Sequence, residues 1–266
     1  MTQLSDLIKT FEALWPSATA EDWDRPGLML GHPSQEVSKV VLSVDVTAEV
    51  IAEASESGAQ VLLSHHPMLL RGVNELGELT LKGNLAAKAI RSGLAVFAAH
   101  TNADIAEIGV GRALAESLGL TEIEPLDKET GHGSVGKISE TTLLDFARFI
   151  ASKLPPTAQG VRVAGAGDKS VSRVALVAGA GDSYLGLALK SGADVFITSD
   201  LRHHPSQDFM EQSKLSDGPA LIDIAHWAAE WLWLDMAARE LAQRHPECEF
   251  VVSDLRTDPW DFAVMQ

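Results

Sequence analysis

The sequence predicts an α/β protein made of two similar lobes, and three observations support this prediction. Apolar runs of strand length alternate with helix-forming segments along most of the 266 residues, which is typical of α/β folds with buried strands. A strand–helix–strand segment at residues 37–64 recurs at residues 171–198. The composition, 45% hydrophobic and 22% charged, is that of a globular protein.

The first half of the chain contains the predicted elements of one lobe. Helix-spaced apolar residues predict a short amphipathic helix within residues 1–15. Further strands and helices follow in alternation, with strands at 40–46, 61–64 and 94–99 and helices at 48–57, 83–92 and 110–118. Residues 121–136 mix Gly, Glu, Asp and His without periodicity and are expected to form a linker.

The second half contains the predicted elements of the other lobe. They are helices at 142–153, 184–190 and 226–244 and strands at 160–165, 194–198 and 220–224. We therefore expect an N-terminal lobe over residues 1–125 and a C-terminal lobe over residues 126–266, which together form one compact unit without an inserted domain.

An internal repeat relates the two predicted lobes. Residues 37–64 align with residues 171–198 without a gap, at a constant offset (171 − 37 = 134). Both copies contain Ser-Gly-Ala before their second strand. Two unrelated strand–helix–strand units are the alternative, since α/β patterns constrain sequence only loosely. We favour two related lobes.

Charge and composition exclude several classes of protein. The chain has 21 basic and 37 acidic residues and a formal charge of −16, so no direct nucleic-acid partner is expected, because such proteins cluster Lys and Arg against phosphates. The single Cys248 cannot form an intrachain disulfide. No apolar run approaches the roughly 20 residues of a membrane-spanning helix, and the N-terminus lacks a signal-peptide pattern. We expect a soluble, cytoplasmic protein.

Two histidines follow a predicted strand in the segment Ser64-His65-His66-Pro67. Ligands gather at the carboxyl ends of strands in open α/β sheets, where adjacent imidazoles can converge on one or two metal ions. A solvent-exposed loop pair is the alternative for this motif taken alone.

A second polar cluster, His100-Thr101-Asn102-Ala103-Asp104, follows the strand at 94–99. Its carboxylate is a hard ligand that could bridge two cations. Helix capping by Asn102 or Asp104 is the alternative interpretation.

A third cluster lies where the strand at 220–224 leads into a helix. His226 and Glu230 are four residues apart, so they share one helix face and could reach the same ion. Such a pair is also common on exposed helices, but here Trp227, Trp231 and Leu234 surround it with apolar groups.

Together the three strand ends supply His65, His66, Asp104, His226 and Glu230. Three imidazoles and two carboxylates suit two divalent ions and leave a coordination position for water. The combination therefore favours a site for two divalent ions per subunit over the separate alternatives. These ligand types suit Zn, Mn, Fe or Co without selecting one of them.

The sequence also resembles the NGG-interacting-factor-three-like proteins, also called GTP cyclohydrolase I type 2 homologues. The resemblance covers nearly the whole chain, and its motifs occur in the family's order. They are Glu21-Asp22-Trp23-Asp24 with Gly27-Leu28, Val44-Asp45-Val46-Thr47, Ser64-His65-His66-Pro67, His100-Thr101-Asn102-Ala103-Asp104, Leu221-Ile222-Asp223 with His226 and Glu230, and Asp258-Pro259-Trp260. Arg25-Pro26 and Gly111-Arg112 depart from the family's usual residues and could alter substrate contacts.

The resemblance implies a dinuclear metal centre in a cleft between two similar α/β lobes, with the five residues above as its ligands. It also implies a ring-shaped homohexamer, built as a trimer of dimers. His204 matches a family histidine near the metal pocket, which gives it an expected role toward substrate or in proton transfer. In the repeat, however, Ser199-Asp200 rather than His203-His204 lies opposite His65-His66. His100 is expected to orient a ligand or to move protons.

These observations predict a metal-dependent hydrolase that acts on a small polar, nucleotide-like substrate. The alternative is a non-enzymatic metal-binding protein with a role in assembly or interaction, whose ligands would look the same. A third hypothesis, a nucleotide-binding protein, rests on Gly165-Ala166-Gly167 and Gly179-Ala180-Gly181. Neither segment matches a complete phosphate-binding fingerprint.

Overall fold

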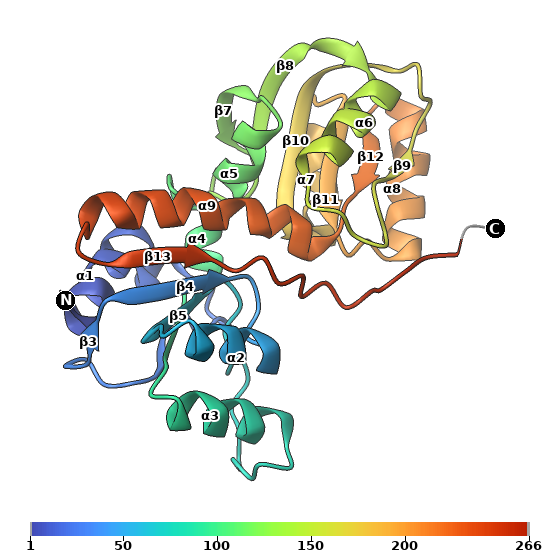
Figure 1. Ribbon diagram of the computed structural model, residues 1–266. Helices are drawn as coiled ribbons and strands as arrows, with labels where there is room; N and C mark the ends of the chain where they lie inside the picture. Colours follow the sequence, from blue (N-terminus) through green and yellow to red (C-terminus); the bar gives the residue numbers. More distant parts are fainter. Residues whose placement is uncertain (1, 265–266) are drawn as a thin grey trace. The chain divides into compact units, whose positions relative to one another are not determined.

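The computed structural model describes residues 2–264, and the chain divides into two compact units (Figure 1). The first unit comprises Met1–Gly109 and Leu234–Thr257, and the second comprises Val110–Trp233 and Asp258–Gln266. This division differs from the predicted lobes, 1–125 and 126–266. The chain returns to the first unit near its end because strand β13 (Glu249–Val252) pairs with a strand of the first sheet.

The first unit is built on a five-stranded sheet with the order β13-β4-β5-β6-β2. Its other strands are β4 (Lys39–Ser43), β5 (Val61–Ser64), β6 (Ala95–Ala98) and β2 (Gly27–Leu30). Strands β13, β4, β5 and β6 are parallel, and β2 is antiparallel to β6. Every residue of β5 and β6 is buried, which explains their continuous apolar runs. The strand predicted to reach residue 46 ends earlier, at Ser43.

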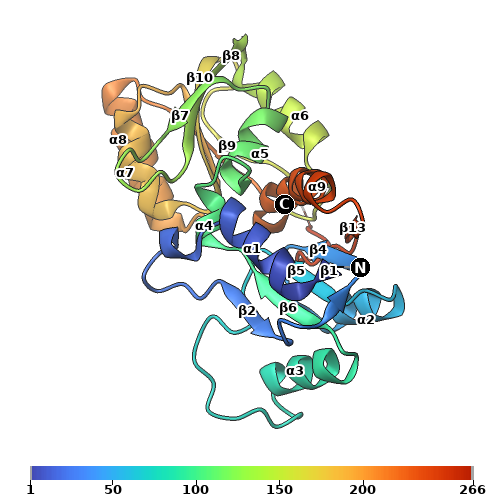
Figure 2. The ribbon, with the colours of Figure 1, turned by 90° about the vertical axis from the view of Figure 1, so that its left-hand side faces the viewer.

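Helices cover both faces of this sheet. Helices α2 (Ala48–Glu56) and α3 (Leu81–Arg91) pack on the face that carries Val41, Leu62 and Val96. The predicted N-terminal helix is α1 (Leu4–Leu14), whose Phe11 contacts Phe97 from the other face, with 4.9 Å between ring centroids. Figure 2 shows α1 separated from α2 and α3 by the strands. The remaining short elements of this unit are β1 (Thr2–Gln3), η1 (Ser17–Thr19), β3 (Glu36–Val37) and α4 (Thr101–Asp104).

The second unit is built on a six-stranded sheet with the order β7-β8-β10-β11-β12-β9. The strands are β7 (Thr121–Pro125), β8 (Ser134–Thr142), β9 (Arg162–Ala164), β10 (Ser170–Ala180), β11 (Val195–Ser199) and β12 (Ala220–Asp223). Only β10, β11 and β12 are parallel to one another. The predicted linker at 121–136 is wrong, because it contains β7 and the start of β8. These segments become strands by pairing in series against β10, a tertiary effect that local periodicity does not show.

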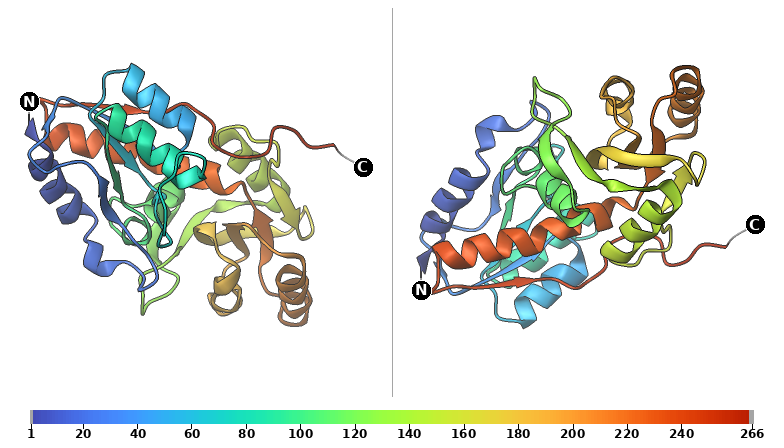
Figure 3. Two further views of the ribbon diagram at one scale, coloured as in Figure 1. Left: turned by 90° about the horizontal axis from the view of Figure 1, so that it is seen from below. Right: turned by 90° about the horizontal axis from the view of Figure 1, so that it is seen from above.

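Helices again lie on both faces of the sheet. Helices α5 (Val110–Ser117) and α6 (Leu143–Lys153) share one apolar core, whereas α7 (Leu185–Lys190) and α8 (His203–Ser216) share another. Figure 3 shows α7 and α8 side by side, and the short turn η2 (Asp182–Tyr184) precedes α7. Helix α8 was not predicted, because only Phe209 and Ser213 of its residues are buried and no apolar stripe marks it.

The two copies of the sequence repeat form equivalent strand–helix–strand units. In the first unit, Val40 on β4 pairs with Val61 on β5. In the second, Val174 on β10 pairs with Val195 on β11, and both positions follow from the same offset of 134 (174 − 40 and 195 − 61). The repeat therefore preserves strand register as well as sequence. Helix α9 (His226–Arg244) follows β12, and none of the helices within residues 2–264 is long and apolar enough to span a membrane.

Candidate metal-binding site

In the first unit, the carboxyl ends of β5 and β6 bring three imidazoles together. His65 and His66 follow β5, and His100 follows β6, the neighbouring parallel strand. One ring nitrogen from each of these histidines lies within 4.8 Å of the others. Asp104, at the end of α4, places its Oδ1 3.6 Å from His65 Nε2. The structure thus brings His65, His66, His100 and Asp104 close together, and their role as metal ligands stays a prediction.

Each of these three imidazoles has its Nδ1 bonded to an oxygen acceptor. His65 Nδ1 donates to the carbonyl oxygen of Ala99 at 2.9 Å, and His66 Nδ1 donates to Asp45 Oδ1 at 2.7 Å. His100 Nδ1 lies 2.7 Å from Asp24 Oδ1. A neutral imidazole that donates from Nδ1 has its lone pair on Nε2, which is the state that binds a metal ion.

Asp24 accepts several hydrogen bonds in addition to that of His100. Besides His100, its buried carboxylate accepts hydrogen bonds from the backbone N–H and hydroxyl of Thr101 and from the backbone N–H of Arg25. Burial alone would raise the pKa of Asp24, but these bonds outweigh it and hold the pKa well below its usual range. Asp24 therefore remains charged and fixes the His100 ring.

In the second unit, His226 and Glu230 occupy successive turns at the start of α9. His226 Nε2 lies 2.9 Å from Glu230 Oε1, and His226 Nδ1 lies 2.7 Å from Asp200 Oδ2. Burial would lower the pKa of His226, but the two carboxylates raise it to about 11. The two carboxylates thus favour the protonated imidazolium, and a cation could take the place of the proton between Nε2 and Glu230.

The backbone around this pair is specialised. A Cβ atom added to Gly179 would lie 2.6 Å from Glu230 Oε1, so the absence of a side chain there makes room for the carboxylate. Asp200 has a φ of 57°, a left-handed conformation that a non-glycine residue adopts at a cost. The first feature leaves space for the Glu230 carboxylate, and the second belongs to the residue whose carboxylate contacts His226.

These donors fit a divalent cation by their chemistry. Imidazole Nε2 and carboxylate oxygens are the ligands of Zn, Mn, Fe and Co sites. Two ligands about 2.0–2.1 Å from one ion can lie about 3 Å apart, which is the spacing of His226 Nε2 and Glu230 Oε1. An acceptor on the second nitrogen of each histidine is the usual arrangement around protein metal ions.

His204, which the sequence analysis gave a catalytic role along with His100, is the second residue of α8 and is exposed. Its ring stacks edge-on against His203, with 5.1 Å between centroids. The structure places His204 in an unpredicted helix, and its proposed role toward substrate stays a prediction.

Three acidic residues that position the histidines were not assigned a role from the sequence: Asp24, Asp45 and Asp200. Asp24 and Asp45 lie within the family motifs, and Asp200 follows β11 at the repeat position of His66. The feature of the sequence that could have identified them is an acidic residue beside a predicted strand end. Which histidine each would contact depends on strand order, which the sequence did not provide.

Comparisons with known proteins agree with this architecture. The sequence matches the Duf34/NIF3 (NGG1p interacting factor 3) family over residues 2–259. It is 41% identical to the GTP cyclohydrolase 1 type 2 homolog of Streptomyces coelicolor, with 98% of this chain and 94% of that protein covered. It is 33% identical to the protein of that name from Clostridium perfringens, with 98% and 99% covered.

Among solved structures, a Bacillus cereus protein related to NIF3 has the same fold. The TM-score is 0.90, with 98% of this chain and 99% of that chain covered at 24% identity. Family match, sequence identity and fold thus extend over nearly the same residues. This mixed α/β chain, with its sheets of five and six strands, belongs to the NIF3 family of GTP cyclohydrolase 1 type 2 homologs.

Proposed function

We propose that this protein is a metal-dependent hydrolase that holds two divalent ions per chain and acts on a small polar, nucleotide-like substrate. The proposed ligands are His65, His66, Asp104, His226 and Glu230. The observation that carries the proposal is that His65, His66 and His226 each bond an oxygen acceptor through Nδ1. Histidines held in this way present Nε2 to a cation. The relatives' name, GTP cyclohydrolase 1 type 2 homolog, supports the nucleotide-like substrate.

In this proposal the chain's own residues orient the ligands and move protons. Asp45 and Asp200 fix the rings of His66 and His226. His100, held by Asp24, lies beside His65 and His66 and is placed to accept or return a proton at Nε2. When bound, the divalent ions would lower the pKa of a coordinated water and polarise the substrate oxygen.

We further propose the ring-shaped homohexamer that the resemblance implies. Exposed apolar side chains support an assembly of some kind, since Leu79, Leu81 and Ile90 of the first unit are all largely exposed. Light scattering on the purified chain should give a mass near six chains. A monomer or dimer would contradict the hexamer without affecting the metal proposal.

Metal analysis of the purified protein tests the proposed function directly. We expect about two divalent ions per chain in the wild type, and a loss of at least one of them in Asp104→Ala and in His226→Ala. His32→Ala is the matched control, because His32 is exposed and its Nδ1 bonds the neighbouring Ser34 hydroxyl. Unchanged metal content in both ligand variants would overturn the proposal.

A substrate screen separates the enzyme from its alternative. The metal-loaded protein should hydrolyse at least one compound among GTP, other nucleotides, phosphoesters and amides, and Asp104→Ala should not. Bound metal without turnover of any of these classes would favour a non-enzymatic metal-binding protein.

A further inference from the structure

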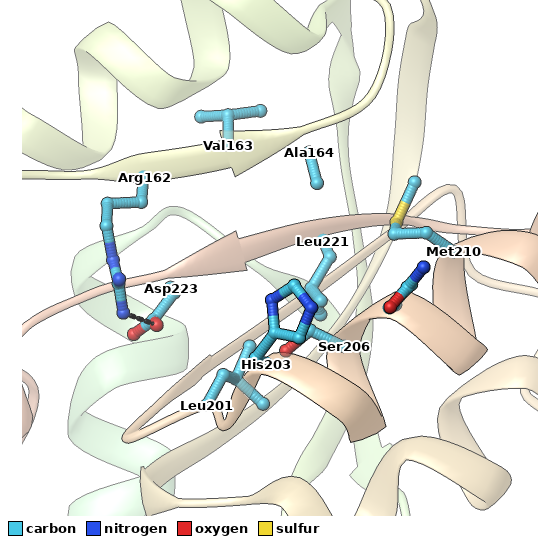
Figure 4. A pocket seen from close by; sticks show the side chains of 10 residues that line it. Arg162, Val163, Ala164, Leu201, His203, Ser206, Met210, Leu221 and Asp223 are labelled. Atoms are coloured by element: carbon cyan, nitrogen blue, oxygen red, sulfur yellow. Dashed lines mark hydrogen bonds and ion pairs between the residues drawn. The ribbon is translucent and has the colours of Figure 1, made fainter.

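The second unit contains a cavity that the proposed metal ligands do not line. It has a volume of about 460 Å³ and lies between β9 and the first half of α8. Sites for small molecules span roughly 300–1,000 Å³, so this cavity suits a compound of the size of a bicyclic ring with one substituent. Figure 4 shows side chains from β9, β12 and α8 around it.

The two ends of the cavity differ in chemistry. At one end, the Arg162 side chain extends from β9 to Asp223, the last residue of β12, and forms an ion pair with it. His203 rises from the first turn of α8 toward the same space. The rest of the lining is mainly apolar, and includes Ala164, Leu201, Met210 and Leu221.

The polar end can accept an anion. The Asp223 side chain is only 8% exposed, and its carboxylate accepts bonds from both Arg162 and Gln159. The Arg162 side chain is 58% exposed, and a guanidinium has five N–H donors, more than the bond to Asp223 engages. A ligand oxygen can therefore bind Arg162 while the buried carboxylate stays paired.

The apolar end favours a flat ring. Ala164 and Leu221 belong to neighbouring strands of the sheet, and Met210 faces them from α8. A methionine side chain adapts to irregular apolar surfaces and makes favourable contacts with aromatic rings. A ring inserted between strand and helix would bury apolar surface on both of its faces.

We propose that this cavity binds a small planar ring compound carrying one carboxylate or phosphate group, with the ring against Ala164, Leu221 and Met210 and the anion against Arg162 and His203. The role of the cavity as part of a substrate site rests on the proposed function. The cavity adjoins the strand ends that hold His226. Leu201 directly follows Asp200, and β12, which ends at Asp223, leads into α9. The cavity would thus hold the part of the substrate that does not react.

Calorimetric titration of the full chain in the presence of a chelator tests the cavity independently of metal. The probes are adenosine 5′-monophosphate, indole-3-acetate, adenosine, indole and ribose 5-phosphate. The first two combine a ring with an anion, and the last three supply only one of these features. We expect at least one combined probe to bind roughly ten-fold or more tightly than adenosine and ribose 5-phosphate. Comparing adenosine 5′-monophosphate with adenosine shows what a phosphate adds to affinity, and comparing indole-3-acetate with indole shows what a carboxylate adds.

Two variants locate the binding. Gln207→Trp fills the cavity, and Gln212→Trp is its control because Gln212 is exposed on the same helix outside the lining. Arg162→Gln removes the cation, and Arg148→Gln on α6 is its control, since Arg148 is exposed and pairs with Asp145 of its own helix. Gln207→Trp and Arg162→Gln should each weaken binding roughly ten-fold or more, with both controls near wild type.

Two results would overturn the inference. The first is that adenosine 5′-monophosphate and indole-3-acetate bind no more tightly than adenosine and ribose 5-phosphate. The second is that Gln207→Trp binds the probes with wild-type affinity. Gln207 is exposed, so this variant decides the matter even where loss of the Arg162–Asp223 pair prevents folding. Metal content of the wild-type chain is measured separately, so a failure here leaves the proposed metal function to its own test.

Discussion

The first and second units both anchor a histidine with an aspartate at a strand end, but the two aspartates do not occupy equivalent positions of the repeat. In the first unit, Asp45 follows β4 and bonds His66, which follows β5. At the offset of 134, the counterpart of Asp45 is Gly179 and that of His66 is Asp200. Asp200 bonds His226, which lies beyond the end of the next strand, β12.

The difference shows which feature of the site the fold conserves. His65, His66 and His226 each take their anchor from the end of a neighbouring strand, and His100 takes Asp24 from the loop before β2, which pairs with β6. The fixed feature is therefore the spacing between adjacent strands, and a position that holds a histidine in one unit can hold an anchoring aspartate in the other. At the repeat position of Asp45, the second unit has Gly179, which leaves room for the Glu230 carboxylate.

Filling the space at Gly179 should have the largest effect. In Gly179→Ala, the new Cβ would meet Glu230 Oε1 at 2.6 Å, and the backbone φ of 74° would be strained. We expect a loss of roughly 2–4 kcal/mol of unfolding free energy, combining left-handed strain with overpacking, and loss of the metal held by His226 and Glu230. Denaturant unfolding and metal analysis measure the two effects.

Gly186→Ala is the matched control for this change. Gly186 lies on α7 of the same unit, and a Cβ there would meet no atom within 4 Å. Alanine should stabilise this helix by up to about 1 kcal/mol. Wild-type stability and metal content in Gly179→Ala would show that the glycine does not serve Glu230.

Neutralising Asp24 should have the next largest effect, and it probes the anchor that the first unit has for His100. Asp24→Asn leaves the donors of His100, Thr101 and Arg25 facing an uncharged and partly donating group, at an expected cost of roughly 2–3 kcal/mol. Asp22→Asn, at an exposed position in the same loop, is the control. Equal unfolding free energies for the two variants would contradict the anchoring role.

Acid titration tests the same anchor without mutation. The pKa of Asp24 is lower in the folded chain than in the unfolded chain, so its charge contributes stability above about pH 4, near the unfolded pKa of Asp. This contribution is lost as the pH falls from there toward the folded pKa. The stability difference between wild type and Asp24→Asn should therefore shrink below about pH 4.

The positions of the candidate ligands at the ends of strands and helices were predictable, because element ends depend on residues close together in the sequence. The strand at 61–64 and the helix at 226–244 have the predicted bounds, since a short buried run and a periodic apolar face mark them. His65, His66, His226 and Glu230 lie at these element ends, where the prediction placed them. Their role as metal ligands stays a prediction until metal is measured.

The anchors and two stretches of the fold were not predictable for a physical reason. Asp200 and Asp24 act across strands, so their partners depend on strand order rather than on neighbours in sequence. The segment 121–136 contains strand because β7 pairs with β8 and β8 with β10, although its own residues show no alternation. Helix α8 buries too few side chains to leave an apolar stripe.

Neutralising Asp45 or Asp200, the aspartates that anchor His66 and His226, should have a smaller effect, on metal affinity rather than on folding. Asp45→Asn and Asp200→Asn should each weaken metal binding by about 10–100-fold, the usual cost of losing a residue that orients a metal ligand. Asp45→Asn should be the more severe, because its side chain is 32% exposed and that of Asp200 is 59% exposed and better screened by solvent. Competition with a chromogenic chelator measures both affinities, with the exposed Asp168→Asn as control. Wild-type metal affinity in both variants would contradict the role of Asp45 and Asp200 in orienting metal ligands.

The smallest expected effect is on the stability difference between glycine and alanine variants, which should have opposite signs at Asp200 and at its repeat counterpart His66. Asp200 is left-handed, with a φ of 57°, whereas its counterpart His66 is not among the left-handed positions found within residues 2–264. Asp200→Gly and Asp200→Ala both remove the anchor, but only glycine relieves the strain, so the glycine variant should be the more stable by about 1 kcal/mol. At His66 the order should invert, because glycine costs roughly 0.5–1 kcal/mol relative to alanine in ordinary backbone. Denaturant unfolding of the four metal-free variants measures this. The same order at both positions would mean that the left-handed conformation of Asp200 carries no backbone cost.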